Sequence, residues 1–254
     1  MDYKTLMDVA ILAGEIMLES NAETYRVEDT MNHILQTSNF ETTEALAIAT
    51  GLVATLDDPS IDDPITIVKR INSIATNLSN IAEVNTISRQ LTSGKLAIPE
   101  AYAALQNISK VQYKQSHKDI ATSVLAAAFA LLLGGGALEM AAAGVNGALL
   151  ALVLKGEKRL GMGSFVRNVV SSAVISIGAG LMHMFLFPTL NMNLVITSTI
   201  MPLVPGTAIT NAIRDTLQGD YTSGGAKALE AFVVALSIAL GVAIGLVITG
   251  GGVR

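Results

Sequence analysis

The sequence predicts a membrane protein with a small cytosolic α+β domain at its N-terminus, followed by a bundle of about five transmembrane helices. Residues 1–118 hold 15 of the 21 acidic residues and 9 of the 16 Lys and Arg residues. Residues 119–254 hold only 6 acids and 7 bases, and residues 168–213 carry no charge over 46 positions. Because a helix needs about 20 apolar residues to cross a bilayer, we expect two domains, residues 1–118 and 119–254.

Within the first domain, apolar residues recur at helical spacing, and β-rich runs are separated by turn residues. The pattern predicts helices around residues 6–17, 27–35, 72–92 and 99–110. It predicts strands over residues 45–48, 52–56 and 65–71. Ser20 and Glu23 form a Ser-x-x-Glu pattern, which is typical of a capping box at the start of the second helix.

The second domain contains five stretches that are candidates for membrane spans. They cover residues 120–137, 140–155, 168–187, 192–213 and 230–250. Soluble proteins also bury apolar helices, but these runs leave too little polar sequence to cover them. We therefore expect the lipid bilayer to surround these helices.

Positive residues near the predicted spans indicate their orientation, since Lys and Arg are enriched in cytoplasmic loops. The basic residues before the first span and between the second and third are Lys110, Lys114, Lys118, Lys155, Lys158, Arg159 and Arg167. The loops near Glu139 and residues 187–191 have none. We therefore expect a multi-pass protein of the cell membrane with a cytoplasmic N-terminal domain and Arg254 outside.

Composition excludes several classes of function. The first 118 residues are net acidic, which argues against nucleic acid as a partner, because that would need clustered Lys and Arg. The chain has no cysteine, so a thiolate metal site and a thiol nucleophile are excluded. The glycines at 134–136 lack the Lys-Ser/Thr pair of a phosphate-binding loop. We expect no cofactor, no metal and no enzymatic activity, because no nucleophile–base pair is visible.

The fourth predicted span is interrupted near its middle by Pro202, Pro205 and Gly206. Proline removes a backbone donor, and freed backbone groups at bilayer depth are tolerated only beside protein or a water-filled cavity. Transporters bind substrates at such broken helices near the midplane. A new half-helix starting near Thr207 would direct its free N–H groups at a carboxylate. The alternative is a purely structural kink.

A polar stripe follows the interruption. Thr207, Thr210, Asn211 and Arg214 stand at i, i+3, i+4 and i+7, so they share one helix face, and Asp215 comes next. A polar stripe on a membrane helix is expected to face the bundle interior or a transport path. We therefore predict that these residues line the path, although the last two could instead mark the cytosolic end of the span.

Three residues are candidates for proton coupling. His183 is the only histidine inside a predicted span, and histidine is a residue type that can relay protons. Asp215 and Asp220 are the carboxylates that follow the polar stripe. The alternatives are a packing role for His183 and a solvated turn at Asp220.

The N-terminal domain carries its own polar motif, Glu23, Arg26 and Glu28. Arg26 is close enough in sequence to pair with either glutamate. The motif is either a salt-bridged helix start or a gate or docking surface for the membrane part. In the membrane part, the Gly241–Gly245 pair predicts a closely packed partner helix, and Asn146 a hydrogen bond to a neighbouring helix.

Two groups of residues together resemble the N-terminal half of the threonine/serine exporter family. The first is Ala13-Gly14 with residues 20–31; the second is Pro205-Gly206, residues 211–215, Gly219-Asp220, Ser223-Gly224 and Glu230-Ala231. Asn21 departs from the pattern, because a small glycine is expected there.

The resemblance implies a cytosolic domain, about five spans, and export of threonine or serine driven by an ion gradient. It also implies a second, smaller membrane subunit, which we expect as a separate chain because this one ends just after the fifth span. The chain is similar, too, to the larger subunit of a two-part succinate exporter, so the substrate could be a dicarboxylate. A membrane-anchored regulatory or binding protein is the alternative, and an intramembrane enzyme ranks last.

Overall fold

The computed structural model describes residues 2–108 and 114–250, without the side chains of residues 157–160. The predicted positions of Lys110 and Arg254, and the side chains of Lys158 and Arg159, lie outside the described residues. The chain divides into two compact units. The first comprises Met1–Gln112 and Gly206–Leu229, and the second comprises Tyr113–Pro205 and Glu230–Arg254.

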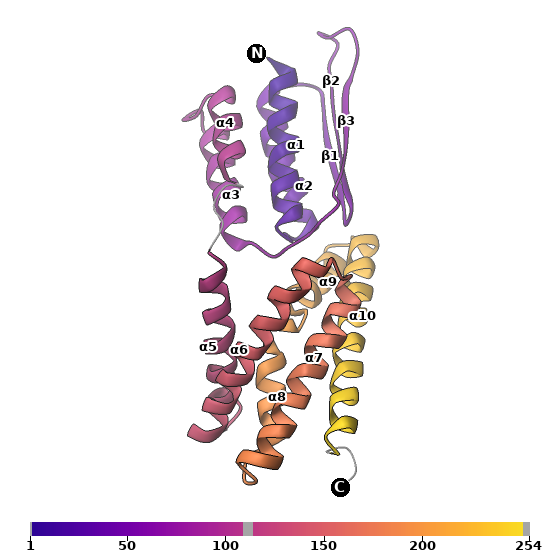
Figure 1. The fold of residues 1–254 in the computed structure, drawn as a ribbon. Helices are drawn as coiled ribbons and strands as arrows, with labels where there is room; N and C mark the ends of the chain where they lie inside the picture. Colours follow the sequence, from indigo (N-terminus) through magenta and orange to yellow (C-terminus); the bar gives the residue numbers. More distant parts are fainter. Residues whose placement is uncertain (1, 109–113, 251–254) are drawn as a thin grey trace. The chain divides into compact units, whose positions relative to one another are not determined.

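The first unit contains a three-stranded antiparallel sheet and a layer of helices, in agreement with the predicted α+β domain (Figure 1). Its N-terminal elements are α1 (Tyr3–Glu19), α2 (Thr24–Leu35), η1 (Gln36–Ser38), β1 (Thr42–Ile48), β2 (Gly51–Asp57), β3 (Ile65–Arg70), α3 (Leu78–Thr92) and α4 (Ile98–Ile108). The sheet order is β1-β2-β3. Helices α1 and α2 pack on the sheet and also contact α3, so they lie between the sheet and the α3–α4 pair.

The apolar face of the sheet explains why this unit folds. On β1, Ala45 and Ala47 are buried while Leu46 between them is exposed, which is the alternation expected of a strand with one covered face. Gly14 on α1 allows close contact with α2, because a Cβ there would lie 2.4 Å from Met31 Sδ.

The predicted helix over residues 72–92 begins later than expected, at Leu78. The Ala75 N–H donates to Glu19 O at 2.8 Å, and the Asn77 N–H donates to Ser20 O at 3.1 Å. These residues are therefore held against the end of α1. Asn77 then caps α3, since its side chain accepts from Asn80 N.

The first unit also contains α9 (Gly206–Leu217) and the first turns of α10 (Tyr221–Ile248). From the sequence, these segments were assigned entirely to the membrane part. Their grouping with α1–α4 was not visible in the hydropathy pattern, and it brings the predicted polar stripe next to the N-terminal domain.

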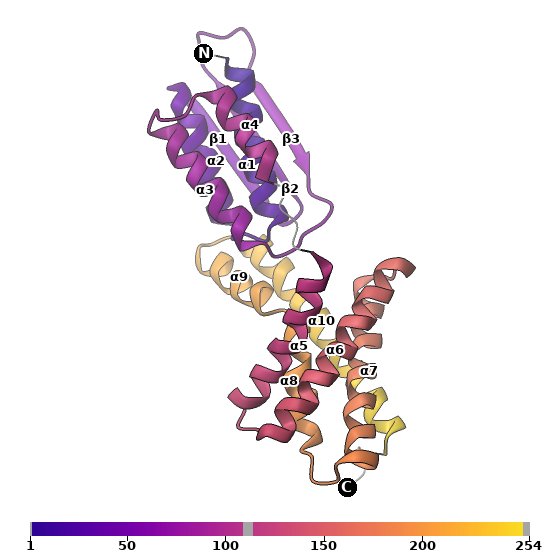
Figure 2. The same cartoon turned by 60° about the vertical axis from the view of Figure 1, so that its left-hand side comes forward.

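The second unit is an assembly of apolar helices (Figure 2). Besides the rest of α10 it contains α5 (Gln115–Leu132), α6 (Ala137–Leu160), α7 (Ser164–Leu181), the π-helical η2 (Met182–Leu186), α8 (Met192–Ile200) and η3 (Met201–Leu203). Asn146 is fully buried, and its Nδ2 donates to Ile175 O at 3.0 Å, as expected for a bond between neighbouring helices.

The predicted close helix contact at Gly241 and Gly245 is present, and the partner helix is α7 of the same chain. A Cβ at Gly241 would lie 2.3 Å from Val169 O, and one at Gly245 would lie 2.5 Å from Ser176 Cβ. These small residues therefore let the two backbones approach, which is a common way of packing helices in membranes.

Within residues 2–108 and 114–250, three helices are long and apolar enough to cross a membrane: Ala137–Gly156, Ser164–Leu186 and Tyr221–Ile248. Met192–Leu203 and Gly206–Leu217 make a fourth span only if they are counted together. Helix α5, at the place of the predicted span 120–137, is not among them. It ends at Leu132, before Gly134 with its positive φ of 87°, and its first turn contains polar residues up to Asp119. The predicted five spans are thus three or four by length and composition.

Candidate functional site

The fourth predicted span is interrupted where the sequence places Pro202, Pro205 and Gly206. Helix α8 ends at Ile200, η3 covers the next three residues, and Val204 is extended with ψ at 129°. The residue before a proline avoids the helical region, which accounts for the conformation of Val204. Helix α9 then starts at Gly206, so the predicted break is present.

The turn between α1 and α2 forms one border of the site. Ser20 ends α1, Asn21 has φ at 63°, and the Ala22 N–H donates to Met17 O at 3.0 Å. This arrangement is a Schellman-type helix end, in which glycine or asparagine takes the left-handed position. The predicted capping box was wrong, because Ser20 closes α1 and Glu23, the N-cap of α2, makes no side-chain cap bond.

A cavity of about 380 Å³ lies between this turn, α2, α3 and α9. It is lined by Asn21, Glu23, Arg26, Thr76, Leu78, Ile81, Ala82, Asn85, Thr207, Thr210, Asn211 and Arg214. All four members of the predicted polar stripe therefore line one cavity. Pro205 and Gly206 precede it and are not among its lining residues.

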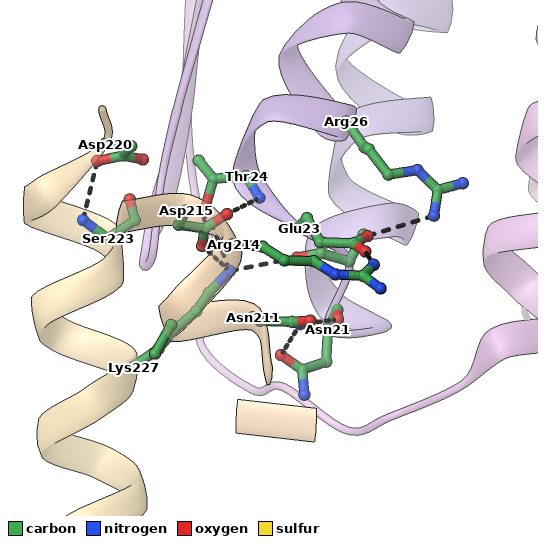
Figure 3. A network of polar contacts seen from close by, with 12 residues as sticks. Asn21, Glu23, Thr24, Arg26, Asn211, Arg214, Asp215, Asp220, Ser223 and Lys227 are labelled. Carbon is green, nitrogen blue, oxygen red and sulfur yellow. Dashed lines mark hydrogen bonds and ion pairs between the residues drawn. The ribbon is translucent and has the colours of Figure 1, made fainter. Parts of the chain in front are cut away.

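Hydroxyl and amide groups join α9 to the α1–α2 turn along one part of this cavity. Asn21 Nδ2 donates to Thr76 Oγ1 and to Thr207 Oγ1, each at 3.2 Å. The two hydroxyls are 3.1 Å apart. Asn211 Nδ2 donates to the backbone oxygen of Asn21 at 2.8 Å (Figure 3). Sequence reasoning did not identify Thr76, since nothing in the segment before α3 indicated its proximity to α9.

The charged part of the cavity consists of one carboxylate between two guanidinium groups (Figure 3). Glu23 Oε2 lies 3.3 Å from Arg26 Nη1, and Glu23 Oε1 contacts Arg214 Nη1. The glutamate side chain is only 8% exposed, whereas those of Arg26 and Arg214 are 38% and 56% exposed. Burial raises the pKa of Glu23, but its backbone hydrogen bond and the two guanidinium groups outweigh burial, so the pKa falls below its usual value.

Glu28 does not pair with Arg26, which the sequence left open. Its Oε1 accepts from the Ala47 N–H at 2.9 Å, on β1. Burial raises the pKa of Glu28, the Ala47 hydrogen bond opposes this, and the negative charges of Asp220 and Asp215 raise it further. Arg26 is thus paired with Glu23, whereas Glu28 binds the backbone of β1.

Asp215 does not line the cavity but lies fully buried behind it. Its Oδ2 is 2.7 Å from Lys227 Nζ, and its Oδ1 accepts from the Thr24 N–H at 3.0 Å. Lys227 also donates to Ala22 O at 3.3 Å. Sequence reasoning missed Lys227, although it is the only Lys or Arg between Arg214 and Arg254 and precedes the last apolar run.

The three candidates for proton coupling are in different surroundings. Asp220 Oδ1 accepts from the Ser223 N–H at 2.9 Å and caps the start of α10. Asp215 is paired with Lys227. His183 belongs to the second unit and lies in the π-helical segment η2. Its Nδ1 is 3.0 Å from the backbone oxygen of Leu190.

The cavity thus offers two guanidinium groups, one carboxylate, three threonine hydroxyls and three asparagine amides. Guanidinium groups bind carboxylates by charge-assisted hydrogen bonds, and a carboxylate accepts from ammonium groups. Pockets for small molecules have volumes of about 300–1,000 Å³, so this cavity is suited to a small polar solute with at least one carboxylate.

Comparison with known proteins gives two matches. A family model described as "Putative threonine/serine exporter" matches residues 8–249. A curated relative named "Probable threonine/serine exporter", from Mycobacterium tuberculosis (strain ATCC 25618 / H37Rv), is 22% identical over 251 residues. The alignment covers 96% of this chain and 46% of the relative, so the chain spans about half the length of the relative. No solved structure matches the chain.

Proposed function

The chain belongs to the threonine/serine exporter family, and on that premise we propose that it is a subunit of a secondary transporter. Its exported solute is a small metabolite with a carboxylate: threonine or serine, or a dicarboxylate such as succinate. The observation that carries this proposal is the cavity in which Thr207, Thr210, Asn211 and Arg214 of α9 face Glu23 and its neighbours. The solute binds there on its way out.

The lining of the cavity supports a solute of this class. Among the described residues, the guanidinium groups of Arg26 and Arg214 each make one hydrogen bond, to Glu23. A guanidinium carries five N–H groups, so donors remain for a solute. The hydroxyls of Thr76 and Thr207 form a polar surface suited to a hydroxyl-bearing side chain. The predicted role of the α9 N-terminus as a carboxylate site remains part of this proposal, with Thr207 in its first turn.

The membrane arrangement is proposed as well. We place the N-terminal domain in the cytoplasm of a cell whose membrane the chain crosses, with α8 and α9 as the broken span. The support is the positive charge at Lys114, Lys118, Lys155 and Arg167, near the ends of α5, α6 and α7. The cavity then faces the cytoplasm, where an exporter takes up its solute.

Two further parts of the proposal concern energy and partners. The lack of a phosphate-binding loop in the sequence favours an ion gradient over ATP, with Asp215, Asp220 and His183 as the groups proposed for proton coupling. A second, smaller membrane subunit is proposed as well, on the resemblance to the exporter family.

Export from loaded vesicles tests the proposed function. Threonine, serine and succinate are loaded in turn, with this chain alone, with a small membrane subunit of the same family, and with the Asn211→Ala variant. Asn211→Ala should lower export at least tenfold, because it removes the bond to Asn21 and a polar wall of the cavity. Thr86→Ala, an exposed change on α3 outside the cavity, should have no effect.

Four results would contradict parts of the proposal. The absence of export for all three solutes would overturn the substrate class. Export by this chain alone would overturn the two-subunit arrangement. Normal export by Asn211→Ala would favour the alternative, a membrane-anchored regulatory protein. Export that ignores an imposed pH gradient would overturn proton coupling.

A further inference from the structure

Charges alternate along the cavity wall in the order Arg26, Glu23, Arg214. A binding site for a simple anion needs only the two cations, yet the structure places a buried carboxylate between them. We propose that Glu23 determines specificity: it binds the ammonium group of a zwitterionic amino acid and excludes dicarboxylates. This inference rests on the proposed function, because it concerns the solute that binds in the same cavity.

Glu23 has free capacity to accept a further hydrogen bond. An ionised carboxylate has about four lone-pair sites. Among the described residues, Glu23 accepts from the two guanidinium groups and from its own backbone N–H, so some acceptor capacity remains. The remaining acceptor sites belong to a residue that lines the cavity. An ammonium group of a bound solute contacts the small part of this side chain that lines the cavity, while both arginines stay in place.

The alternating charges of Arg26, Glu23 and Arg214 favour a zwitterionic amino acid over a dicarboxylate. A zwitterionic amino acid puts its carboxylate on a guanidinium group and its ammonium group on Glu23, so that both charges are matched. A dicarboxylate can use both arginines, but one of its negative groups must then lie beside the carboxylate of Glu23. Like charges at close range in a partly desolvated site are unfavourable, so binding of the dicarboxylate is weakened.

The low pKa of Glu23 is consistent with this role, because a carboxyl group that stays ionised at neutral pH repels a second anion. The exposure of the three side chains is consistent with it too. Glu23 is held almost completely buried, while the arginines keep part of their surface accessible to a ligand.

Binding of threonine and of succinate to the purified full-length chain, measured by calorimetry at pH 7, tests the inference. The Glu23→Gln substitution keeps the shape of the side chain and removes its charge. It should weaken threonine binding and tighten succinate binding, each by about tenfold, since a hydrogen bond to a charged group contributes on this scale. Glu83→Gln removes the same charge from an exposed position on α3 and should change neither affinity.

A second variant covers the case in which Glu23→Gln does not fold. Glu23→Asp keeps the charge and shortens the side chain, so it should bind threonine more weakly but still prefer it to succinate. The inference is overturned if Glu23→Gln leaves the threonine-to-succinate affinity ratio unchanged, or if Glu23→Asp loses the preference. If the wild-type chain binds neither solute, the proposed function itself is wrong, and this result is distinct from an unchanged ratio.

Discussion

Lys227 and Asp215 form a buried ion pair, in which Nζ lies 2.7 Å from Oδ2 and the side chains are 5% and 0% exposed. The same carboxylate accepts from the Thr24 N–H and its hydroxyl, both at 3.0 Å. Helix α2 has no side-chain cap of its own, so Asp215 provides one from α9. The pair therefore connects α2, α9 and α10, and fixes Arg214 beside Glu23.

Replacing Lys227 by Met should be strongly destabilising, because it leaves a fully buried carboxylate without its cation. Removing one partner of a buried ion pair typically costs about 3–5 kcal/mol. Thermal unfolding of the purified chain measures the effect. The double variant Lys227→Met/Asp215→Leu should recover most of the loss, because exchange of both partners for apolar residues is often nearly neutral. A double variant as unstable as the single one would contradict this account.

Asn21 contributes a left-handed backbone turn and a side-chain amide in the cavity, and two substitutions separate these contributions. Its backbone has φ at 63°, which glycine adopts freely and alanine does not. Asn21→Ala should therefore lose about 1 kcal/mol of stability, whereas Asn21→Gly should stay close to wild type. Both remove the side-chain amide from the cavity, so both should weaken threonine binding. Equal unfolding temperatures for the two variants would show that the left-handed turn is not important.

Much of this fold follows from patterns visible in the sequence. The β-rich runs of β1 and β2, the apolar spacing of α1 and α2, and the proline-rich break before Gly206 each predict the element found there. The shared helix face of Thr207, Thr210, Asn211 and Arg214 follows from their spacing alone, and in the structure all four line one cavity.

What the sequence could not indicate are contacts between distant segments. The pairing of Arg214 with Glu23 and of Lys227 with Asp215 depends on the packing of α9 against the α1–α2 turn, which no local pattern encodes. The capping-box prediction failed for the same kind of reason. Ser20 has the right spacing to Glu23, but the left-handed Asn21 assigns Ser20 to the preceding helix.

The contact between α7 and α10 can be tested with two glycines of α10. A Cβ at Gly241 would lie 2.3 Å from Val169 O, a backbone atom that cannot easily move, whereas one at Gly225 would meet nothing within 4 Å. Gly241→Ala should therefore cost about 1–3 kcal/mol through overpacking. Gly225→Ala should be neutral or stabilise by up to about 1 kcal/mol through helix propensity. Unfolding temperatures that fall equally would contradict the close contact.

Because the pKa of Glu28 is raised, the stability of the folded protein depends on pH. A carboxyl group with a higher pKa in the folded state stabilises that state when protonated. Its contribution is complete below the unfolded pKa and is lost as pH rises through the folded pKa. Glu28→Gln keeps an acceptor for the Ala47 N–H and does not titrate. The stability of this variant relative to wild type should therefore increase as pH rises above about 4.5, the ordinary value for Glu. A difference that is constant between pH 4 and 7 would contradict the raised pKa.

The most direct test of the central claim is protection of the cavity by its solute. Because the chain contains no cysteine, Thr210→Cys introduces a unique thiol on the cavity wall. Thr86→Cys places one on the exposed side of α3 as a control. The rate of labelling by a polar maleimide is measured with and without threonine, serine or succinate. We predict that a transported solute slows labelling at Thr210→Cys severalfold and leaves Thr86→Cys unchanged. Equal labelling of Thr210→Cys with and without a solute that the protein is shown to export would contradict binding in this cavity.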